Sequence, residues 1–349
     1  MKYSRKQIEY KKEVVCKAQP LLSPAETFDL NSFQQGVLAT KKSGKERMNM
    51  KKLLFIYNPN AGTGMLKPKL ADVLDIFTKA GYEITVYPTQ RYHDGLAKTL
   101  SYTGDYDLVV CSGGDGTLDE VVTGMAQREK KVPIGYIPAG TTNDFASSLH
   151  ISKDMLGAAD TAVNGVPFPC DIGHFNDDYF VYIAAFGLFT DVSYETDQNM
   201  KNVLGHLAYV LEGAKRLFNI PSYKVKVTHD DEVIEDEFVY GMVTNSRSVG
   251  GFRNLIGKQV GFDDGVFEVT LIKTPKNPIE LQEIIAALMI EQMDSKYMYT
   301  FKSGRIMFES IEEIPWTLDG EFGGEHDEVV VENLNKELQI MVPGTHEED

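Results

Sequence analysis

A glycine-rich segment around one carboxylate is the part of this sequence best suited to chemistry. The apolar run at residues 108–111 leads directly into residues 113–117, which read Gly-Gly-Asp-Gly-Thr. Glycine tolerates positive φ and lets the backbone approach a ligand, and free amides at the start of a following helix attract anions. We therefore predict a phosphate-binding loop in which Asp115 holds a metal ion or an ordered water. The alternative is a tight turn in which Asp115 caps the helix.

A second glycine cluster follows the apolar run at residues 53–57. Residues 58–64 read Asn-Pro-Asn-Ala-Gly-Thr-Gly, and an apolar helical pattern comes next. Ligands of open parallel sheets bind beyond the carboxyl ends of the strands, so this loop and the Asp115 loop are expected side by side. The lysine-bearing pattern GxxxxGK[ST] is absent, which argues against a standard P-loop nucleotide site. A simple strand-to-helix turn is the alternative.

A third cluster, Pro-Ala-Gly-Thr-Thr-Asn-Asp, ends the apolar run at residues 134–137. Here Thr141 could offer a hydroxyl, while Asn143 and Asp144 could join the network around a magnesium ion, which prefers oxygen ligands and retained waters. The alternative is that Thr141 or Asn143 only caps a helix.

Two carboxylates, Asp319 and Glu321, flank Gly320 in the segment Trp-Thr-Leu-Asp-Gly-Glu-Phe-Gly-Gly. This pattern predicts a turn that places both side chains at an exposed edge. Either could accept a proton from a substrate hydroxyl, and the sequence does not separate them. A hairpin turn with Asp-Gly at its centre is the alternative.

From residue 51 the chain alternates strand and helix patterns, which predicts a parallel sheet with helices on both faces. The predicted strands are residues 53–57, 82–87, 108–111 and 134–137, and the helices are 66–77, 96–100 and 118–125.

After about residue 170, short β-like runs predict an antiparallel second domain, a β-sandwich. The runs are residues 179–185, 223–228, 237–245, 266–273 and 306–308, interrupted by helical patterns at 204–218 and 279–293. The apolar stripes of both helices fit packing on the sandwich better than contact with a membrane. We expect a nucleotide-binding domain at residues 48–170, to which a segment near 328–345 returns, and a substrate domain at 171–327.

Residues 1–47 carry ten Lys or Arg and five Asp or Glu, and we expect a leader outside the fold. The net charge of −16 argues against a nucleic-acid partner, which needs a basic surface. Three dispersed cysteines indicate free thiols, without disulfides or a zinc site. No run suits a membrane span or a secretory signal, so we predict a cytoplasmic protein.

The segments SGGDGTLDEVV, PAGTTNDFA and LDGE, in this order and spacing, resemble the diacylglycerol kinase catalytic domain family of lipid kinases. The resemblance runs from about residue 50 to the C-terminus and is closest to the soluble Gram-positive type. It implies a nucleotide-binding α/β domain, a C-terminal β-sandwich, and ATP with Mg²⁺ as cofactors.

Carried onto this sequence, the resemblance implies several roles. Asp115 and Asp144 would organise a network of water and magnesium, and Asp319 or Glu321 would be the base. A structural magnesium would lie in the loop at residues 261–266. The expected ATP-binding residues are Asn58, Thr89, Gly114, Asp115, Gly116, Thr117, Thr141, Asn143 and Asp144, and the expected ligands of the structural magnesium are Gly261, Asp264 and Val266.

The expected reaction is phosphoryl transfer from ATP to a lipid hydroxyl, with diacylglycerol as the leading acceptor. A sphingoid-type lipid alcohol, NAD, or binding of ATP without turnover are the alternatives. An insoluble substrate implies transient contact with the inner membrane leaflet, and a homodimer is possible on this sequence.

Overall fold

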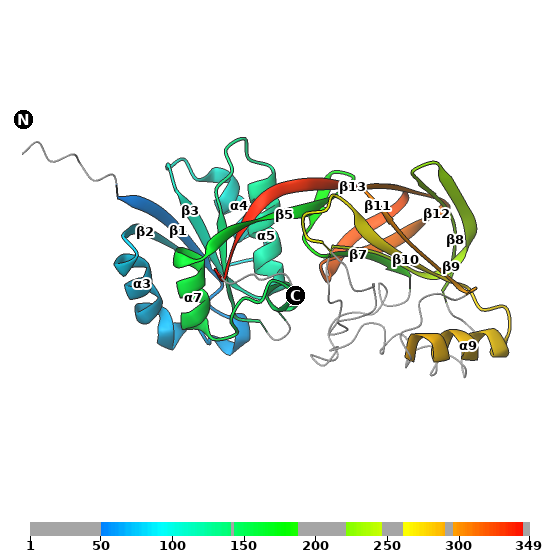
Figure 1. Cartoon of the computed structure of the whole chain (residues 1–349), viewed down its shortest axis with the longest axis horizontal. Coiled ribbons are helices and arrows are strands. Elements are labelled where there is room, and N and C mark those ends of the chain that lie inside the picture. Colours follow the sequence, from blue (N-terminus) through cyan, green and yellow to red (C-terminus); the bar gives the residue numbers. More distant parts are fainter. Residues whose placement is uncertain (1–49, 141–142, 188–220, 246–260, 290–295, 345–349) are drawn as a thin grey trace, which may run out of the picture. The chain divides into compact units, whose positions relative to one another are not determined.

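The computed structural model describes residues 50–140, 143–187, 221–245, 261–289 and 296–344 (Figure 1). The leader at residues 1–47 and the predicted helix at 204–218 lie outside this part of the chain. The first elements are β1 (Lys51–Tyr57), η2 (Ala61–Thr63), η3 (Lys67–Lys69), α3 (Leu70–Lys79), β2 (Tyr82–Pro88), α4 (Asp94–Ser101), β3 (Leu108–Gly113), α5 (Asp115–Ala126), β4 (Ile134–Pro138), α6 (Asp144–Ser148), α7 (Met155–Asn164) and β5 (Val166–Phe175). The remaining elements are β6 (Asp178–Phe180), β7 (Ile183–Gly187), β8 (Tyr223–His229), β9 (Glu232–Thr244), β10 (Phe267–Lys273), α9 (Pro278–Met289), β11 (Met298–Ser303), β12 (Arg305–Leu318) and β13 (Glu321–Val342).

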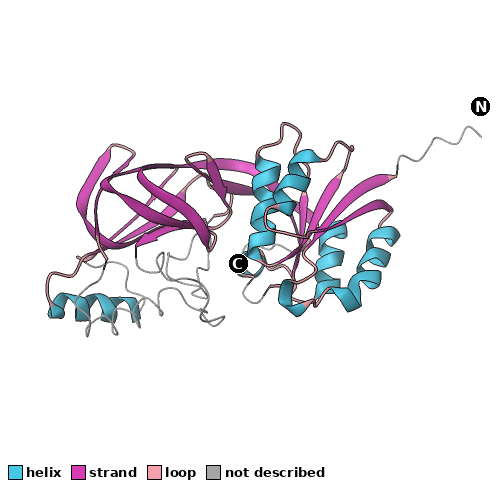
Figure 2. Cartoon of the chain, turned by 180° about the vertical axis from the view of Figure 1, so that it is seen from behind, coloured by secondary structure: helices cyan, strands magenta, loops and turns pink. Residues whose placement is uncertain are grey.

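A parallel sheet forms the N-terminal domain. Its strands follow the order β2-β1-β3-β4, and every neighbouring pair is parallel. Strands β3 and β4 are buried along their whole length, because helices cover both faces of the sheet (Figure 2). Helices α3 and α7 pack together on one face, and α4 packs with α5 on the other (Figure 1). This confirms the predicted α/β domain.

The C-terminal domain is antiparallel and rich in β-strands, as the fold class predicted. Strand β9 pairs with β8 along its first half and with β7 and β10 along its second half. Strand β12 likewise pairs with β8 near its start and with β7 near its end. These two strands therefore join the layers of the domain. The Trp316 indole lies at the centre of its aromatic core, 5.0 Å from the ring of Phe175 and 4.8 Å from that of Phe186.

Helix α9 packs on the C-terminal domain, as its apolar stripe predicted. Leu281, Ile284, Ile285 and Leu288 are buried in one cluster with residues of β7, β9 and β10. The predicted continuation of this helix beyond residue 289 lies outside the described residues. Core packing, and not an exposed apolar face, accounts for these four side chains.

Strand β13 is the longest element and pairs with strands of both domains. Its first half pairs with β12, and Val331–Val342 run antiparallel to β5. Near its end, Ile340 lies opposite Ile134 of β4 in parallel pairing. The C-terminal part of the chain therefore extends the N-terminal sheet.

The predicted strand at residues 179–185 is interrupted. The structure has β6 and β7 in its place, and Val181 and Tyr182 lie between them. The amides of these two residues donate to the side chain of Asp319, which explains the interruption.

Candidate active site

Loops that follow four parallel strands meet at one edge of the sheet. The Asn58 amide, just after β1, donates to the carbonyl of Ser112 in β3 at 2.8 Å. The Thr89 amide, after β2, donates to the Tyr57 carbonyl at 2.9 Å, and the Ala139 amide, after β4, donates to Gly113 at 2.8 Å. Strand β1 lies between β2 and β3, so the order in which successive strands join the sheet reverses here, as at the ligand site of open α/β sheets.

The glycines of these loops permit close backbone contacts. Gly62 has φ of 53°, and a Cβ on it would lie 2.3 Å from the carbonyl oxygen of Ala139. A Cβ on Gly113 would lie 2.3 Å from Thr117 Oγ1. Gly114 faces Gly140, and a Cβ on Gly140 would lie 2.8 Å from the Gly114 Cα. Gly62 and Gly140 therefore let the loops after β1, β3 and β4 approach each other, and Gly113 lets Thr117 pack within its own segment.

Gly113, Gly114 and Gly116 can adopt positive φ, but none of them does so in the structure. Among the described residues, the positive-φ glycines near the site are Gly62, Gly64 and Gly320. The glycines around Asp115 allow close packing because they have no Cβ atom. Helix α5 also begins at Asp115, earlier than predicted.

Asp115 and Asn143 connect the glycine loop to the loop after β4. The Asn143 amide donates to Asp115 Oδ2 at 3.2 Å. The Asn143 side chain accepts from the Gly140 amide at 3.0 Å and donates to the Gly140 carbonyl at 2.8 Å. It makes no side-chain hydrogen bond that caps α6, so the capping alternative for Asn143 does not hold. Asn143 thus fixes the shape of this loop.

The other predicted nucleotide residues are placed as follows. Asn58 Oδ1 accepts from the Asn60 amide at 2.9 Å, and Thr89 is buried. Asp144 is the first residue of α6, and only its backbone is described. Thr141 lies outside the described residues.

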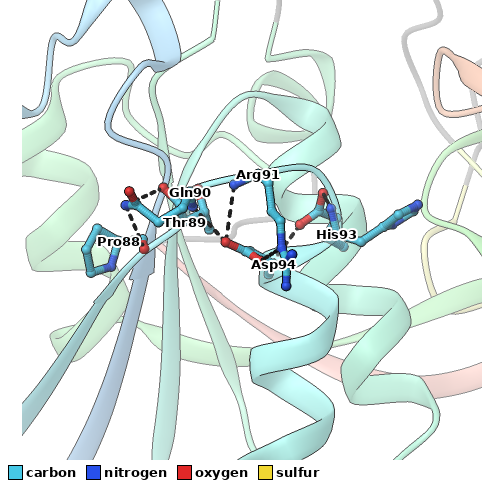
Figure 3. Close-up of polar contacts among 8 residues, drawn as sticks. Pro88, Thr89, Gln90, Arg91, His93 and Asp94 are labelled. Atoms are coloured by element: carbon cyan, nitrogen blue, oxygen red, sulfur yellow. Dashed lines mark hydrogen bonds and ion pairs between the residues drawn. The ribbon is translucent and has the colours of Figure 1, made fainter.

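The loop between β2 and α4, which carries Thr89, is held by two carboxylates, Asp94 and Glu120, that were not predicted from the sequence. Asp94 Oδ2 accepts from the amides of Gln90 and Arg91 at 2.7 and 3.2 Å (Figure 3). Glu120 of α5 accepts from the amides of His93 and Gly95, both at 2.8 Å. Asp94 therefore fixes the shape of the loop, and Glu120 holds it against the helix that follows the glycine segment. The only sequence signal was the acidic residue Asp94 at the start of α4, and Glu120, inside α5, had none.

Asp319 is buried and held by backbone amides. Its Oδ2 accepts from Val181 at 2.5 Å, and its Oδ1 accepts from Tyr182 at 3.0 Å and Ile183 at 2.9 Å. Burial raises the pKa of Asp319 to about 6, against the opposing effect of these amides. Only 5% of the residue is exposed, so the predicted exposed edge was wrong for Asp319. Its carboxylate binds the backbone between β6 and β7.

Glu321, two residues later, is exposed and points to the glycine segment. A Cβ on Gly116 would lie 3.4 Å from Glu321 Oε1. Partial burial and the nearby charge of Glu120 raise the pKa of Glu321, while His93 lowers it. Of the two carboxylates in the turn, Glu321 is the one placed beside the predicted phosphate loop.

The loop at residues 261–266 is organised by a buried carboxylate that the sequence analysis did not single out. Asp171 accepts from the amides of Gly265 at 2.8 Å and Lys336 at 2.7 Å. Within the loop, Asp264 Oδ1 accepts from the Val266 amide at 3.2 Å. A Cβ on Gly261 would lie 2.9 Å from the Asp264 carboxyl carbon. The three predicted magnesium ligands therefore lie together.

A salt bridge lies next to this loop. Lys302 Nζ is 2.8 Å from Glu268 Oε1 and 3.8 Å from Asp264 Oδ2. Burial raises the pKa of Glu268 to about 7. Among the described residues, no group of three or more His, Cys, Asp or Glu side chains is arranged to hold a metal ion.

Two further findings bear on the predictions from composition. Cys111 and Cys170 are free and buried, as expected, and Cys16 lies outside the described residues. Within the described part of the chain, no helix has the length and apolar character of a membrane span.

A parallel sheet with a glycine loop at its switch point, followed by a β-rich domain that supplies a carboxylate, defines a class of kinase. Residues 52–175 match the diacylglycerol kinase catalytic domain. The diacylglycerol kinase of Bacillus subtilis (strain 168) is 36% identical over 84% of this chain and 97% of its own length. That of Staphylococcus carnosus (strain TM300) is 34% identical over 84% of this chain and 95% of its own.

A solved structure agrees with these relatives. A Bacillus anthracis str. Sterne protein, provisionally assigned as a diacylglycerol kinase, superimposes with a TM-score of 0.72 at 26% identity. The match covers 86% of this chain and 97% of that one. The chain belongs to the diacylglycerol kinase family, and it is a lipid kinase.

Proposed function

We propose that this kinase transfers the γ-phosphoryl group of Mg-ATP to the free hydroxyl of diacylglycerol and so forms phosphatidic acid. The observation that supports this reaction is the approach of Glu321 to Gly116. It places a carboxylate able to accept a proton beside the loop whose amides suit phosphate. The names of the relatives support diacylglycerol as the acceptor.

Glu321 is the base in this proposal, and Asp319 is not. An ionised carboxylate has about four lone-pair positions for hydrogen bonds, and three of those on Asp319 receive backbone amides. A group held in this way cannot turn toward a substrate hydroxyl. Glu321 has an exposed side chain and a raised pKa, which favour proton acceptance near neutral pH.

The nucleotide lies over the loops after the four parallel strands in this proposal. The amides of residues 114–117 and the loops that carry Asn58 and Thr89 bind the phosphates and the nucleoside. Thr141, Asn143 and Asp144 complete the site, and Asn143 acts through the backbone of Gly140. Asp115 orients water around the magnesium of Mg-ATP. That ion offsets charge on the transferring phosphoryl group when bound.

We assign a structural magnesium to the loop of Gly261, Asp264 and Val266. One carboxylate and neighbouring backbone carbonyls are oxygen ligands of the kind that hard cations such as magnesium bind. The Asp264 carboxyl lies against Gly261 and accepts from the Val266 amide, so the three residues are close enough to contribute to one site. Its role is to hold the loop that also packs on Asp171.

A lipid acceptor requires transient contact with a membrane surface, and we place the enzyme at the inner leaflet during turnover. Co-sedimentation with liposomes that contain diacylglycerol, with and without anionic lipid, tests this contact. Absence of co-sedimentation with every one of these liposomes would contradict it.

An acceptor panel tests the proposed reaction. The purified protein is incubated with labelled ATP and diacylglycerol, a sphingoid base or NAD, and each product is resolved. We expect label in phosphatidic acid and its loss in Glu321→Gln. Label in the sphingoid base would identify another lipid alcohol, and label in NAD alone would overturn the proposal. Binding of ATP without any labelled product would indicate a regulator that does not turn over.

A further inference from the structure

Two aromatic side chains are exposed in the part of the chain that the structure describes. Phe322 is 65% exposed and Tyr92 is 63% exposed, whereas the other phenylalanine, tyrosine and tryptophan side chains of that part are buried or partly buried. A single exposed apolar side chain is ordinary on a protein surface. These two differ because both lie on segments that approach the same side of α5.

Phe322 follows Glu321 at the start of β13. In the ladder with β12, Phe322 lies opposite Thr317 and Glu321 lies opposite Leu318. Successive side chains of a strand leave it on opposite sides, so a molecule that contacts both residues must cross the turn at Gly320. A Cβ on Gly320 would meet no atom within 4 Å, so the space at the turn is open to a ligand.

Tyr92 lies on the loop that Glu120 holds against α5. Glu120 accepts from the His93 amide at 2.8 Å, and the centres of the Tyr92 and His93 rings are 3.8 Å apart. His93 has φ of 63°, a left-handed conformation that few residues other than glycine adopt, and its imidazole points away from Asp94 (Figure 3). The loop therefore has a fixed shape from which the two rings project.

Helix α5 brings the Tyr92 loop and the Glu321 turn together. Gly116, which Glu321 approaches, and Glu120, which holds the loop, are four residues apart on one side of the helix. Their separation along the helix axis is about 6 Å. Partial burial and the charge of Glu321 raise the pKa of Tyr92, in agreement with this placement.

We propose that Phe322 and Tyr92 bind the acyl chains of the lipid acceptor and so position its hydroxyl at Glu321. This inference rests on the proposed role of Glu321 as the base. The free hydroxyl of a diacylglycerol is on the carbon next to one that carries an acyl ester, so the apolar part begins close to the reacting oxygen. That oxygen must lie about 2.6–3.2 Å from the base. Consecutive Cα atoms are about 3.8 Å apart, so the side chain that follows Glu321 can reach the start of an acyl chain.

Four substitutions test the two rings. Phe322→Ala and Tyr92→Ala each remove a ring, and Tyr92→Phe removes only the hydroxyl. Ile311→Ala, at a side chain of β12 that is 97% exposed, is the matched control for loss of an exposed apolar group. All four changes are at exposed positions, so Tm should stay close to that of the wild type.

The activity test measures kcat and KM for diacylglycerol in detergent micelles at saturating ATP, together with KM for ATP. Covering an aromatic side chain favours binding, so each alanine variant should raise KM for diacylglycerol about tenfold. We expect kcat at saturating lipid and KM for ATP to remain unchanged, and Tyr92→Phe and Ile311→Ala to match the wild type. A normal KM for diacylglycerol in both alanine variants would overturn the inference.

Two comparisons identify what the rings contact. The rise in KM should shrink for a diacylglycerol with very short acyl chains, and an equal rise for long and short chains would contradict contact with the acyl chains. Phe322→Ala should co-sediment with phosphatidylcholine liposomes that lack diacylglycerol to the same extent as the wild type. Loss of this co-sedimentation would assign the ring to the bilayer surface and not to the acceptor.

The inference and the proposed base can fail separately. If Phe322→Ala raises KM for diacylglycerol but Glu321→Gln keeps full turnover, Glu321 is not the base and the contact with the acyl chains stands. If Glu321→Gln loses turnover but both alanine variants keep a normal KM for diacylglycerol, the base stands and the aromatic contact is refuted.

Discussion

Asp319→Asn should unfold the protein more easily, whereas Glu321→Gln should stop turnover without affecting stability. The two residues flank Gly320 in one turn, but Asp319 binds the backbone between β6 and β7 whereas Glu321 faces the proposed phosphate loop. Asn tolerates the φ of 50° at position 319, so the substitution leaves backbone strain unchanged. What changes is the pattern of hydrogen bonds beneath the turn.

The cost of Asp319→Asn follows from its three amide partners. The new NH₂ group faces the Val181 amide or its neighbours, and one buried donor without a partner costs about 1–3 kcal/mol. The other two bonds lose the charge of their acceptor, which lowers each by about 1 kcal/mol. The total of about 3–5 kcal/mol is a large part of the stability of an ordinary domain, about 5–15 kcal/mol.

The assay combines thermal denaturation with kinase kinetics. For a chain of this size, a loss of 1 kcal/mol lowers Tm by about 2–4 °C, so Asp319→Asn should melt about 10 °C below the wild type. Glu321→Gln, an exposed substitution, should shift stability by less than about 0.5 kcal/mol. Its kcat should fall by about 10²–10⁴-fold because the base is lost. The reasoning would be refuted if Asp319→Asn melted like the wild type, or if Glu321→Gln kept its kcat.

Three further predictions address the surrounding loops. Gly62→Ala should lower Tm and weaken ATP binding measured by calorimetry, because the added Cβ would lie 2.3 Å from the Ala139 carbonyl oxygen. The control is Gly81→Ala, at a position with φ of 86° and no atom within 4 Å of the added Cβ. This control should lose only the cost of positive φ in alanine, about 1–2 kcal/mol of stability. Glu120→Gln should speed hydrogen exchange at the His93 and Gly95 amides and lower stability by about 1–3 kcal/mol, whereas exposed Glu129→Gln should do neither. A chelator should lower Tm of the wild type but not of Asp264→Asn if the loop at residues 261–266 holds magnesium, and equal shifts in both proteins would exclude that site.

The N-terminal domain could be predicted from the sequence because its strands are buried on both faces. Such strands read as continuous apolar runs, and β1, β3 and β4 each contain one. Helix α7 was missed because its buried face consists of Met155 and small residues such as Ala158 and Ala159. The start of β13 was missed because its first eight residues are largely exposed and polar, so they show no apolar alternation.

The different roles of Asp319, which binds backbone amides, and Glu321, the proposed base, could not be predicted from their positions in the sequence. Both flank a glycine in one turn, and both are ordinary carboxylates in sequence. The difference arises from the interruption at residues 181–182, which lies more than 130 residues earlier in the chain. A local pattern contains no information about such a partner, whereas the glycine loops were recognisable because their requirement for close approach is local.

Helix α5 joins these observations, since three of its residues face three different parts of the site. Gly116, Asp119 and Glu120 are spaced by three and four, so they lie on one side of the helix. Gly116 lies beside Glu321, Asp119 has a buried carboxylate oxygen, and Glu120 holds the loop of residues 93–95. A shift of one residue along the helix would turn these side chains by about 100° away from their partners. The acidic residues that follow the glycine segment are therefore as necessary to the geometry of the site as the glycines that begin it.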